Sequence, residues 1–163
     1  SSSSRRPSAR LSIPLVPPAP AMASTQMWTS KLGKEYAKHV IESLDQEHHQ
    51  VLKALRKLDK NSRCAECAAA DTCWASVSLG VFLCVRCSDV HRAVGTHISK
   101  VKGCSGTYLW GPDEIARMRE TGNARAEELY GHRHRPLPES ASKEERVKAC
   151  EFKYGQGPAA AAP

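Results

Sequence analysis

Hydrophobic residues recur at steps of three and four along residues 29–59, which predicts a helical segment. The recurring positions are Leu32, Tyr36, Val40, Leu44, Val51, Leu52, Leu55 and Leu58. His48 and His49 interrupt this stripe, so the pattern leaves open whether one helix or two helices form. We expect both histidines, and His39 as well, to lie on the solvated surface of the segment.

Residues 74–83 carry a different pattern, in which apolar residues alternate with small or polar ones. This alternation is typical of a strand, and Gly80 marks a bend within it, so the segment predicts strand, turn and strand. Residues 98–104 are expected to form a third strand. Gly103 lies inside that strand and weakens it.

Three helical patterns follow toward the C-terminus. Pro112 stands at a first helical position before two acidic residues, and Gly122 is the expected stop. Asn123 is placed to cap a second helix. Ser142 and Glu145 have the spacing of a capping box and open a third helix. Helices are therefore expected to surround a short three-stranded sheet, which makes the chain an α+β protein.

The two ends of the chain differ from the middle. Residues 1–28 are rich in Ser, Pro and Ala and contain no acidic residue, and residues 155–163 form a Gly-Pro-Ala tail. Because prolines interrupt helices and these segments have few large apolar residues, we expect both to be disordered. Between them we predict an N-terminal helical extension, 29–47, and a folded domain, 48–154.

Composition narrows the classes of partner. The 163 residues are 40% hydrophobic but 6% aromatic, so burial alone stabilises a small domain weakly and a metal link is reasonable. A net charge of +7 is compatible with a nucleic acid, an acidic membrane surface or an acidic protein face. We expect no nucleic-acid partner, because no dense Lys/Arg block with interleaved aromatics is present. We also expect no transmembrane segment, because no apolar run approaches about 18 residues.

Four of the seven cysteines form two C-x2-C pairs separated by 16 residues. The paired residues are Cys64, Cys67, Cys84 and Cys87. Two tight turns that each aim two thiolates at one point predict a single structural Zn²⁺ with all four coordination positions filled. The alternative is two unrelated reduced dithiols. Cys73, Cys104 and Cys150 are then reduced thiols in a cytosolic setting.

The second cysteine pair leads directly into a short helical pattern. Ser88 is a suitable N-cap, Asp89 favours a first turn, and Gly95 is the expected end of the helix. Arg92 therefore lies on a helix whose direction the metal fixes. Such an arginine could reach a phosphate in the active site of a partner, and the alternative is a surface arginine on a polar helix face.

The combined pattern C-x2-C-x16-C-x2-C-x4-R resembles the zinc finger of the Arf GTPase-activating proteins. The resemblance covers about residues 51–154. Further matching positions are Trp74, Ala75, Ser76, Gly80, Val81, Phe82, Leu83, His91, Gly95, His97, Ser99, Val101, Lys102, Trp110, Gly122, Asn123, Phe152 and Tyr154. The resemblance implies that the four paired cysteines are zinc ligands and that Arg92 is the family's arginine finger.

The resemblance also implies a function. The partner would be a GTP-bound Arf-type small GTPase, whose GTP hydrolysis the chain would stimulate in trans rather than as a self-contained enzyme. The chain contains no P-loop motif and would hold no nucleotide itself. A cytoplasmic location and a role in vesicle trafficking are implied, with peripheral association at the Golgi or other endomembranes left open.

The chain departs from the family pattern in one segment. The family reads V-[KR]-S-x-x-L-D-x-W, whereas residues 101–110 are one residue longer, carry no acidic residue and have Gly103 in place of the Ser. Thr72 replaces the family's Pro before the zinc-finger Trp. Because the 101–110 segment helps to shape the GTPase-facing surface in the family, a catalytically weak protein-interaction module is the alternative function.

Overall fold

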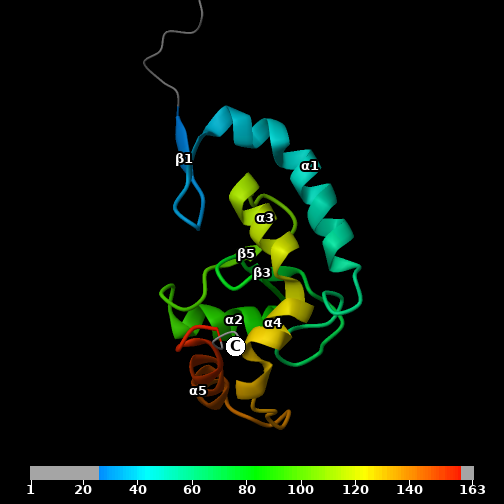
Figure 1. The fold of residues 1–163 in the computed structure, drawn as a ribbon, viewed down its shortest axis with the longest axis vertical. Coiled ribbons are helices and arrows are strands. Elements are labelled where there is room, and N and C mark those ends of the chain that lie inside the picture. The colour runs from blue at the N-terminus through cyan, green and yellow to red at the C-terminus, as the bar shows by residue number, and fades with distance from the viewer. Residues whose placement is uncertain (1–25, 159–163) are drawn as a thin grey trace, which may run out of the picture.

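A computed structural model describes residues 26–158. Its elements are β1 (Met27–Thr29), β2 (Glu35–Ala37), α1 (Lys38–Arg56), β3 (Trp74–Ser76), β4 (Val81–Leu83), α2 (Val85–Val94), β5 (Val101–Gly103), α3 (Pro112–Glu120), α4 (Gly122–Tyr130), the 3-10 helix η2 (Gly131–Arg133) and α5 (Lys143–Tyr154). Figure 1 shows β1 and the first turns of α1 at one end of the molecule, and α2 with α5 at the other. The predicted disordered tails, 1–28 and 155–163, lie largely outside the described residues.

The helical prediction for residues 29–59 is wrong at its start, because residues 27–37 form a two-stranded hairpin. β1 pairs antiparallel with β2, with Trp28 opposite Tyr36. Gly33 in the connecting turn has a φ of 92°, a left-handed conformation that glycine adopts without strain. Three-residue strands are too short to show an alternating pattern, and the apolar residues of this hairpin happen to have helical spacing.

A single helix, α1, then runs from Lys38 to Arg56. His48 is buried in it, and its Nδ1 lies 2.8 Å from the carbonyl oxygen of Trp110, so the expectation that His48 lies in solvent is wrong. This hydrogen bond satisfies the ring inside the protein, which lets the helix continue through the interruption in the apolar stripe. The division into a 29–47 extension and a 48–154 domain stays a prediction.

The second sheet is antiparallel, with strand order β4-β3-β5. Trp74 of β3 lies opposite Leu83 of β4 and opposite Gly103 of β5. The predicted strand, turn and strand over residues 74–83 is confirmed, with Gly80 at a φ of 74° in the turn. The predicted third strand is present as β5, but it is shorter than expected.

Two hydrophobic clusters lie on opposite sides of this sheet, because successive residues of a strand point to opposite faces. Val81 and Leu83 of β4 belong to a cluster with buried residues of α2, α4 and α5. Phe82 belongs to a cluster with Leu52 of α1, Trp110 and buried residues of α3. The sheet therefore separates an end of the molecule built around α2 and α5 from an end built around α1 and α3.

The helix caps partly follow the sequence signals. Ser142 and Glu145 form the predicted capping box at the start of α5, and Pro112 opens α3. The helix α2 begins at Val85 rather than after Ser88, because the sulfur of Cys84 accepts the backbone N–H of Cys87 and makes Cys84 the N-cap. The Cys84 side chain thus takes the capping role that was expected of Ser88.

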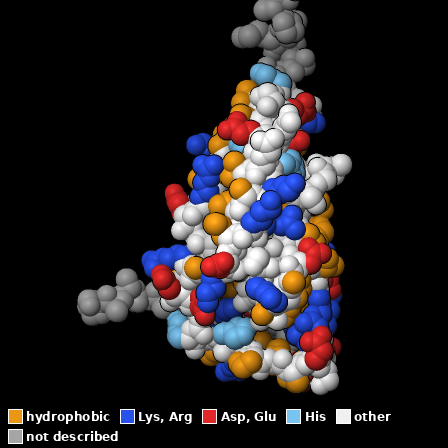
Figure 2. Space-filling model, turned by 90° about the vertical axis from the view of Figure 1, so that its right-hand side faces the viewer, with side chains coloured by type: hydrophobic (Ala, Val, Ile, Leu, Met, Phe, Trp, Pro, Cys, Tyr) orange, Lys and Arg blue, Asp and Glu red, His pale blue; other side chains and the backbone are white. Residues whose placement is uncertain are grey.

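Charged side chains are mixed on the surface. Figure 2 shows a face of the molecule on which Lys and Arg side chains are interspersed with acidic, hydrophobic and uncharged ones rather than gathered into one block. Of the helices in residues 26–158, none combines the length and the apolar character that crossing a membrane requires.

Candidate zinc site and arginine finger

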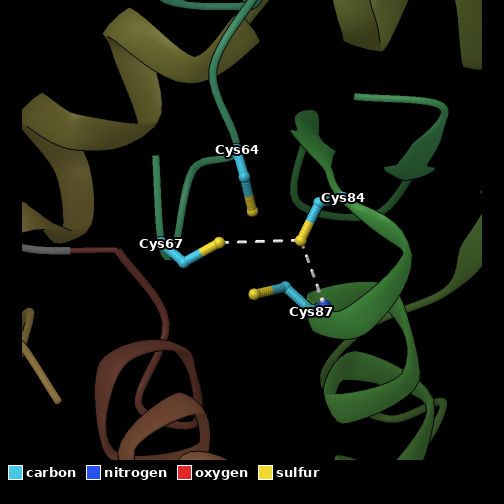
Figure 3. Close-up of side chains that lie close together, drawn as sticks. All are labelled: Cys64, Cys67, Cys84 and Cys87. Atoms are coloured by element: carbon cyan, nitrogen blue, oxygen red, sulfur yellow. Dashed lines mark hydrogen bonds between the residues drawn. The ribbon is translucent and has the colours of Figure 1, made fainter. Parts of the chain in front are cut away.

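Four cysteine side chains from two segments of the chain point toward one centre (Figure 3). They are Cys64, Cys67, Cys84 and Cys87, and their sulfur atoms all lie within 4.8 Å of one another. The first pair lies in the connection between α1 and β3, and the second pair spans the end of β4 and the first turn of α2. The structure thus brings together the four cysteines that the sequence motifs pair.

The geometry of this cluster fits a four-coordinate zinc ion. Tetrahedral zinc–thiolate bonds of about 2.3 Å place the sulfurs about 3.8 Å apart, and the Cys67 and Cys84 sulfurs are separated by 3.6 Å. The backbone N–H groups of Glu66 and Cys87 donate to the sulfurs of Cys64 and Cys84, each at 3.5 Å. Such N–H groups favour the thiolate form that a metal requires.

The thiols also interact with one another. The hydrogen bond from the Cys87 thiol lowers the pKa of Cys64 to about 5, and the same contact raises the pKa of Cys87. Burial raises the pKa of Cys84 to about 11. One thiolate therefore forms readily among the four sulfurs, and a second negative charge beside it needs a cation.

The Asn123 side chain links the two cysteine segments by hydrogen bonds. Its amide nitrogen donates to the carbonyl oxygens of Lys60 and Arg63, just before the first cysteine pair, at 3.0 and 2.7 Å. Its amide oxygen accepts the backbone N–H of Phe82, just before the second pair, at 2.7 Å. The predicted role of Asn123 as an N-cap is wrong, since Thr121 occupies that position of α4.

The helix α2 carries Cys87 in its first turn and Arg92 near its end. The Arg92 side chain is exposed, and its guanidinium lies 4.3 Å from the centre of the Trp74 ring. An Nη2 group of Arg92 also donates to the hydroxyl of Ser88 at 3.3 Å. The helix ends as predicted at Gly95, which has a φ of 103°. Arg92 therefore lies on the surface of the protein, at the far end of a helix that starts in the cysteine cluster.

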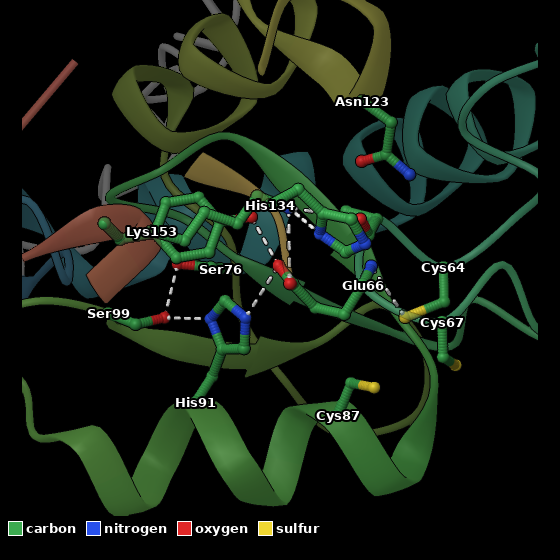
Figure 4. A network of polar contacts seen from close by, with 12 residues as sticks. Cys64, Glu66, Cys67, Ser76, Cys87, His91, Ser99, Asn123, His134 and Lys153 are labelled. Carbon is green, nitrogen blue, oxygen red and sulfur yellow. Dashed lines mark hydrogen bonds and ion pairs between the residues drawn. The ribbon is translucent and has the colours of Figure 1, made fainter. Parts of the chain in front are cut away.

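A buried network fixes the middle of α2 (Figure 4). His91 is completely buried, its Nε2 lies 3.2 Å from a carboxylate oxygen of Glu66, and its Nδ1 lies 2.8 Å from the hydroxyl of Ser99. The Ser99 hydroxyl donates to that of Ser76 in β3 at 2.7 Å. The helix is thereby tied to the first cysteine loop and to the sheet through one side chain.

Glu66, which lies between the two cysteines of the first motif, is the centre of this network. Lys153 of α5 donates to its carboxylate at 3.3 Å, and the hydroxyl of Tyr154 donates to it as well. Burial alone would raise the pKa of Glu66, but the hydrogen bond to His91 and the charges of His91 and Lys153 lower it to about 2. Sequence reasoning missed Glu66, whose one signal is an acidic residue inside a C-x2-C pair.

The fold and the cysteine cluster fit a small zinc-finger domain. The ArfGap family model, described as "Putative GTPase activating protein for Arf", matches residues 49–162. The chain therefore belongs to the Arf GTPase-activating protein family, as its cysteine and arginine pattern indicated. The hairpin β1–β2 and the first part of α1 precede the matched residues.

Individual relatives agree with this assignment. The chain is 42% identical over 91 residues to "Probable ADP-ribosylation factor GTPase-activating protein AGD15" of Arabidopsis thaliana, which covers 56% of this chain and 39% of that protein. It is 37% identical over 111 residues to stromal membrane-associated protein 1 of Mus musculus, covering 68% of this chain and 24% of that protein. The chain thus spans less than half the length of these curated relatives.

Solved structures show the same fold. The ArfGap domain of HIV-1 Rev binding protein superimposes with a TM-score of 0.62, over 72% of this chain and 90% of that domain. At 19% sequence identity, this similarity concerns the fold alone. The small sheet surrounded by helices is therefore found in an ArfGap domain whose sequence is very different from this one.

Proposed function

We propose that this protein stimulates GTP hydrolysis by an Arf-type small GTPase, with Arg92 as an arginine finger supplied in trans. The observation that carries the proposal is the position of Arg92, exposed at the end of a helix whose first turn lies in the cysteine cluster. One Zn²⁺ held by Cys64, Cys67, Cys84 and Cys87 would be structural, because four thiolates leave no coordination position for water.

The chemistry explains why an arginine suits this position. Phosphoryl transfer from GTP to water spreads negative charge over the transferring group, and an arginine supplied in trans accelerates it by about 10³–10⁵. The planar guanidinium can contact two oxygens at once, which a lysine ammonium cannot do. The GTPase would hold the nucleotide, while this chain would supply the positive charge of Arg92 and place it against the transferring phosphoryl group.

The contacts that Arg92 makes in the free protein are weak enough to be exchanged. An exposed cation–π contact contributes about 0.5–1 kcal/mol, and the hydrogen bond to Ser88 adds a similar amount. A rate gain of 10³–10⁵ corresponds to about 4–7 kcal/mol of transition-state stabilisation. The free energy lost when the guanidinium leaves Trp74 is therefore small compared with the transition-state stabilisation that it would supply at the phosphate.

A second candidate function rests on the segment that departs from the family pattern. Residues 104–109 form an irregular connection between β5 and α3 that begins beside Trp74. If this segment prevents productive approach of the GTPase, the protein is a binding module that recognises the GTPase without accelerating hydrolysis. A GTPase activator works at substoichiometric amounts, whereas a binding module shifts nucleotide-state preference.

The decisive experiment is a single-turnover GTP hydrolysis assay with a panel of Arf-type GTPases, with and without this protein. We expect Arg92→Lys to retain binding and to lose at least about 10³-fold of the stimulation. Arg125→Lys is a matched control, because Arg125 is an exposed arginine on α4 that pairs with Glu128. Stimulation by Arg92→Lys equal to that of the unmodified protein would rule out the finger assignment.

The proposed activity also bears on where the protein acts in the cell. An activator of Arf-type GTPases must meet its GTP-bound partner, so we extend the proposal to a cytoplasmic protein in vesicle trafficking that associates peripherally with the Golgi or another endomembrane. Imaging of the tagged full-length protein together with its GTPase tests this extension separately from the catalytic assay.

A further inference from the structure

Three side chains from β3, α2 and the connection after β5 lie next to one another, with the half-buried Trp74 ring between the exposed Tyr108 and Arg92. The Tyr108 ring meets the Trp74 ring edge to face, with centroids 5.6 Å apart and an angle of 71° between the planes. The Arg92 guanidinium lies over the Trp74 ring at 4.3 Å. The Tyr108 side chain is 41% exposed. We call Tyr108, Trp74 and Arg92 the aromatic ledge.

Tyr108 is held in this position from two sides, so its exposure is a fixed feature and not the disorder of a loop. A Cβ atom at position 103 would lie 2.6 Å from the Tyr108 ring, so Gly103 leaves the space that the ring fills. On the other side, His49 of α1 reaches the carbonyl oxygens of Cys104 and Tyr108, with its Nδ1 and Nε2 at 3.2 and 2.9 Å.

Two departures from the family pattern, Gly103 and the extra residue in the segment 101–110, lie in the part of the chain that positions Tyr108. The glycine at position 103 makes room for the Tyr108 ring, which lies over β5 in a segment one residue longer than the family pattern. The result is an aromatic side chain packed against Trp74, in a stretch where the family pattern has a carboxylate. Gly103 and the longer segment are thus both found where Tyr108 reaches the surface.

The ledge would lose part of its cover whenever Arg92 moves. When the guanidinium leaves Trp74 for a phosphate, the ring surface that it covered is exposed next to Tyr108. Uncovered apolar surface is unfavourable in water, so a partner that draws Arg92 away binds better when it covers this ring with an apolar surface of its own. Aromatic side chains at the centre of an interface often dominate its affinity.

We propose that the aromatic ledge is a contact surface for the GTP-bound GTPase, and that Tyr108 is a specificity-determining residue that selects partners with an apolar surface opposite it. This inference rests on the proposed function, and it concerns affinity for the partner rather than the chemical step. Tyr108 acts by contact with the GTPase, while Arg92 acts on the phosphate.

The first test is equilibrium binding of the whole chain to Arf-type GTPases loaded with a non-hydrolysable GTP analogue. We expect Tyr108→Ala to raise Kd about tenfold, a typical loss for an aromatic residue in an interface. Tyr108→Phe, which keeps the ring, should stay within about threefold of the unmodified protein. Phe152→Ala is the matched control, because Phe152 is 39% exposed and also lies under an arginine, Arg135.

The second test is hydrolysis as a function of the concentration of this protein. Tyr108→Ala should raise the half-saturating concentration about tenfold and leave the maximal rate unchanged. A variant that folds differently would change the rate, the melting temperature and the metal content together. Since Tyr108 is exposed, melting temperature and zinc content of Tyr108→Ala should match those of the unmodified protein.

The outcomes separate this inference from the proposed function. If the protein accelerates hydrolysis and Tyr108→Ala has unchanged Kd and half-saturating concentration, the function stands and the ledge inference is wrong. If Tyr108→Ala weakens binding but no variant accelerates hydrolysis, the ledge stands and activation is wrong. Equal losses for Tyr108→Ala and Phe152→Ala, or no binding to any Arf-type GTPase, would overturn the inference.

Discussion

Replacing Lys102 by methionine tests how strongly a buried ion pair joins β5 to α3. The Lys102 ammonium lies 2.8 Å from a carboxylate oxygen of Glu114, and the two side chains are 5% and 0% exposed. The same ammonium donates to the carbonyl oxygen of Leu109 at 2.7 Å and lies 4.8 Å from the ring centre of Trp28 in the hairpin. The hairpin thus covers a charge pair inside the protein.

The structure sets the size of the expected effect. Lys102→Met keeps the apolar stem and removes the charge, which leaves the Glu114 carboxylate buried without its counter-charge. Removing one partner of a buried pair costs about 3–5 kcal/mol. The backbone N–H groups of Gly111 and Lys31 still donate to Glu114, at 2.8 and 3.3 Å, so we expect the lower end, about 3 kcal/mol. That loss lowers Tm by roughly 10 °C.

Guanidinium unfolding followed by circular dichroism, with zinc present throughout, measures this cost. A control pair is Lys60 with Glu127, which has the same 2.8 Å distance but 60% and 62% exposed side chains. Lys60→Met should leave the free energy of unfolding nearly unchanged, because solvent screens an exposed pair. The cycle of Lys102→Met and Glu114→Gln should show a coupling energy of about 2 kcal/mol. Equal costs for the two lysine variants, or additive costs in the cycle, would refute the role of burial.

Two further predictions test the metal and the connection between the cysteine segments. Chelation of zinc should unfold the domain, seen as loss of circular dichroism, because structural zinc contributes about 10–16 kcal/mol. Asn123→Ala should cost about 2–4 kcal/mol in the same unfolding assay, because it removes the partner of the buried Phe82 N–H and the hydrogen bond to the Arg63 carbonyl.

The sequence signals that succeeded are those in which local chemistry decides the structure. Paired cysteines, the capping box at Ser142 and the proline that opens α3 act within a few residues, and the structure has each of them where the pattern predicts. The Gly95 end of α2 belongs to the same kind, since a positive φ restricts the position to few residue types.

The signals that failed depend on contacts between distant segments. The hairpin at residues 27–37 is stabilised by side chains far along the chain: Ser30 and Tyr36 donate to the Asp113 carboxylate at 2.6 and 3.0 Å. His48 is buried because Trp110 supplies its partner, and Glu66 is satisfied by residues from α2 and α5. No local pattern encodes these partners, so helical spacing and surface polarity were misleading there.

Two attachments, not one, determine where Arg92 lies. Zinc would fix the first turn of α2 through Cys87, but a helix held at one point could still tilt. One turn further on, His91 is buried between Glu66 and Ser99, which prevents that tilt. Arg92, the next residue, points outward and makes two weak contacts, with Trp74 and Ser88. The backbone of Arg92 is therefore fixed while its guanidinium is held only by weak contacts, which is the combination that the proposed insertion into a partner's nucleotide site requires.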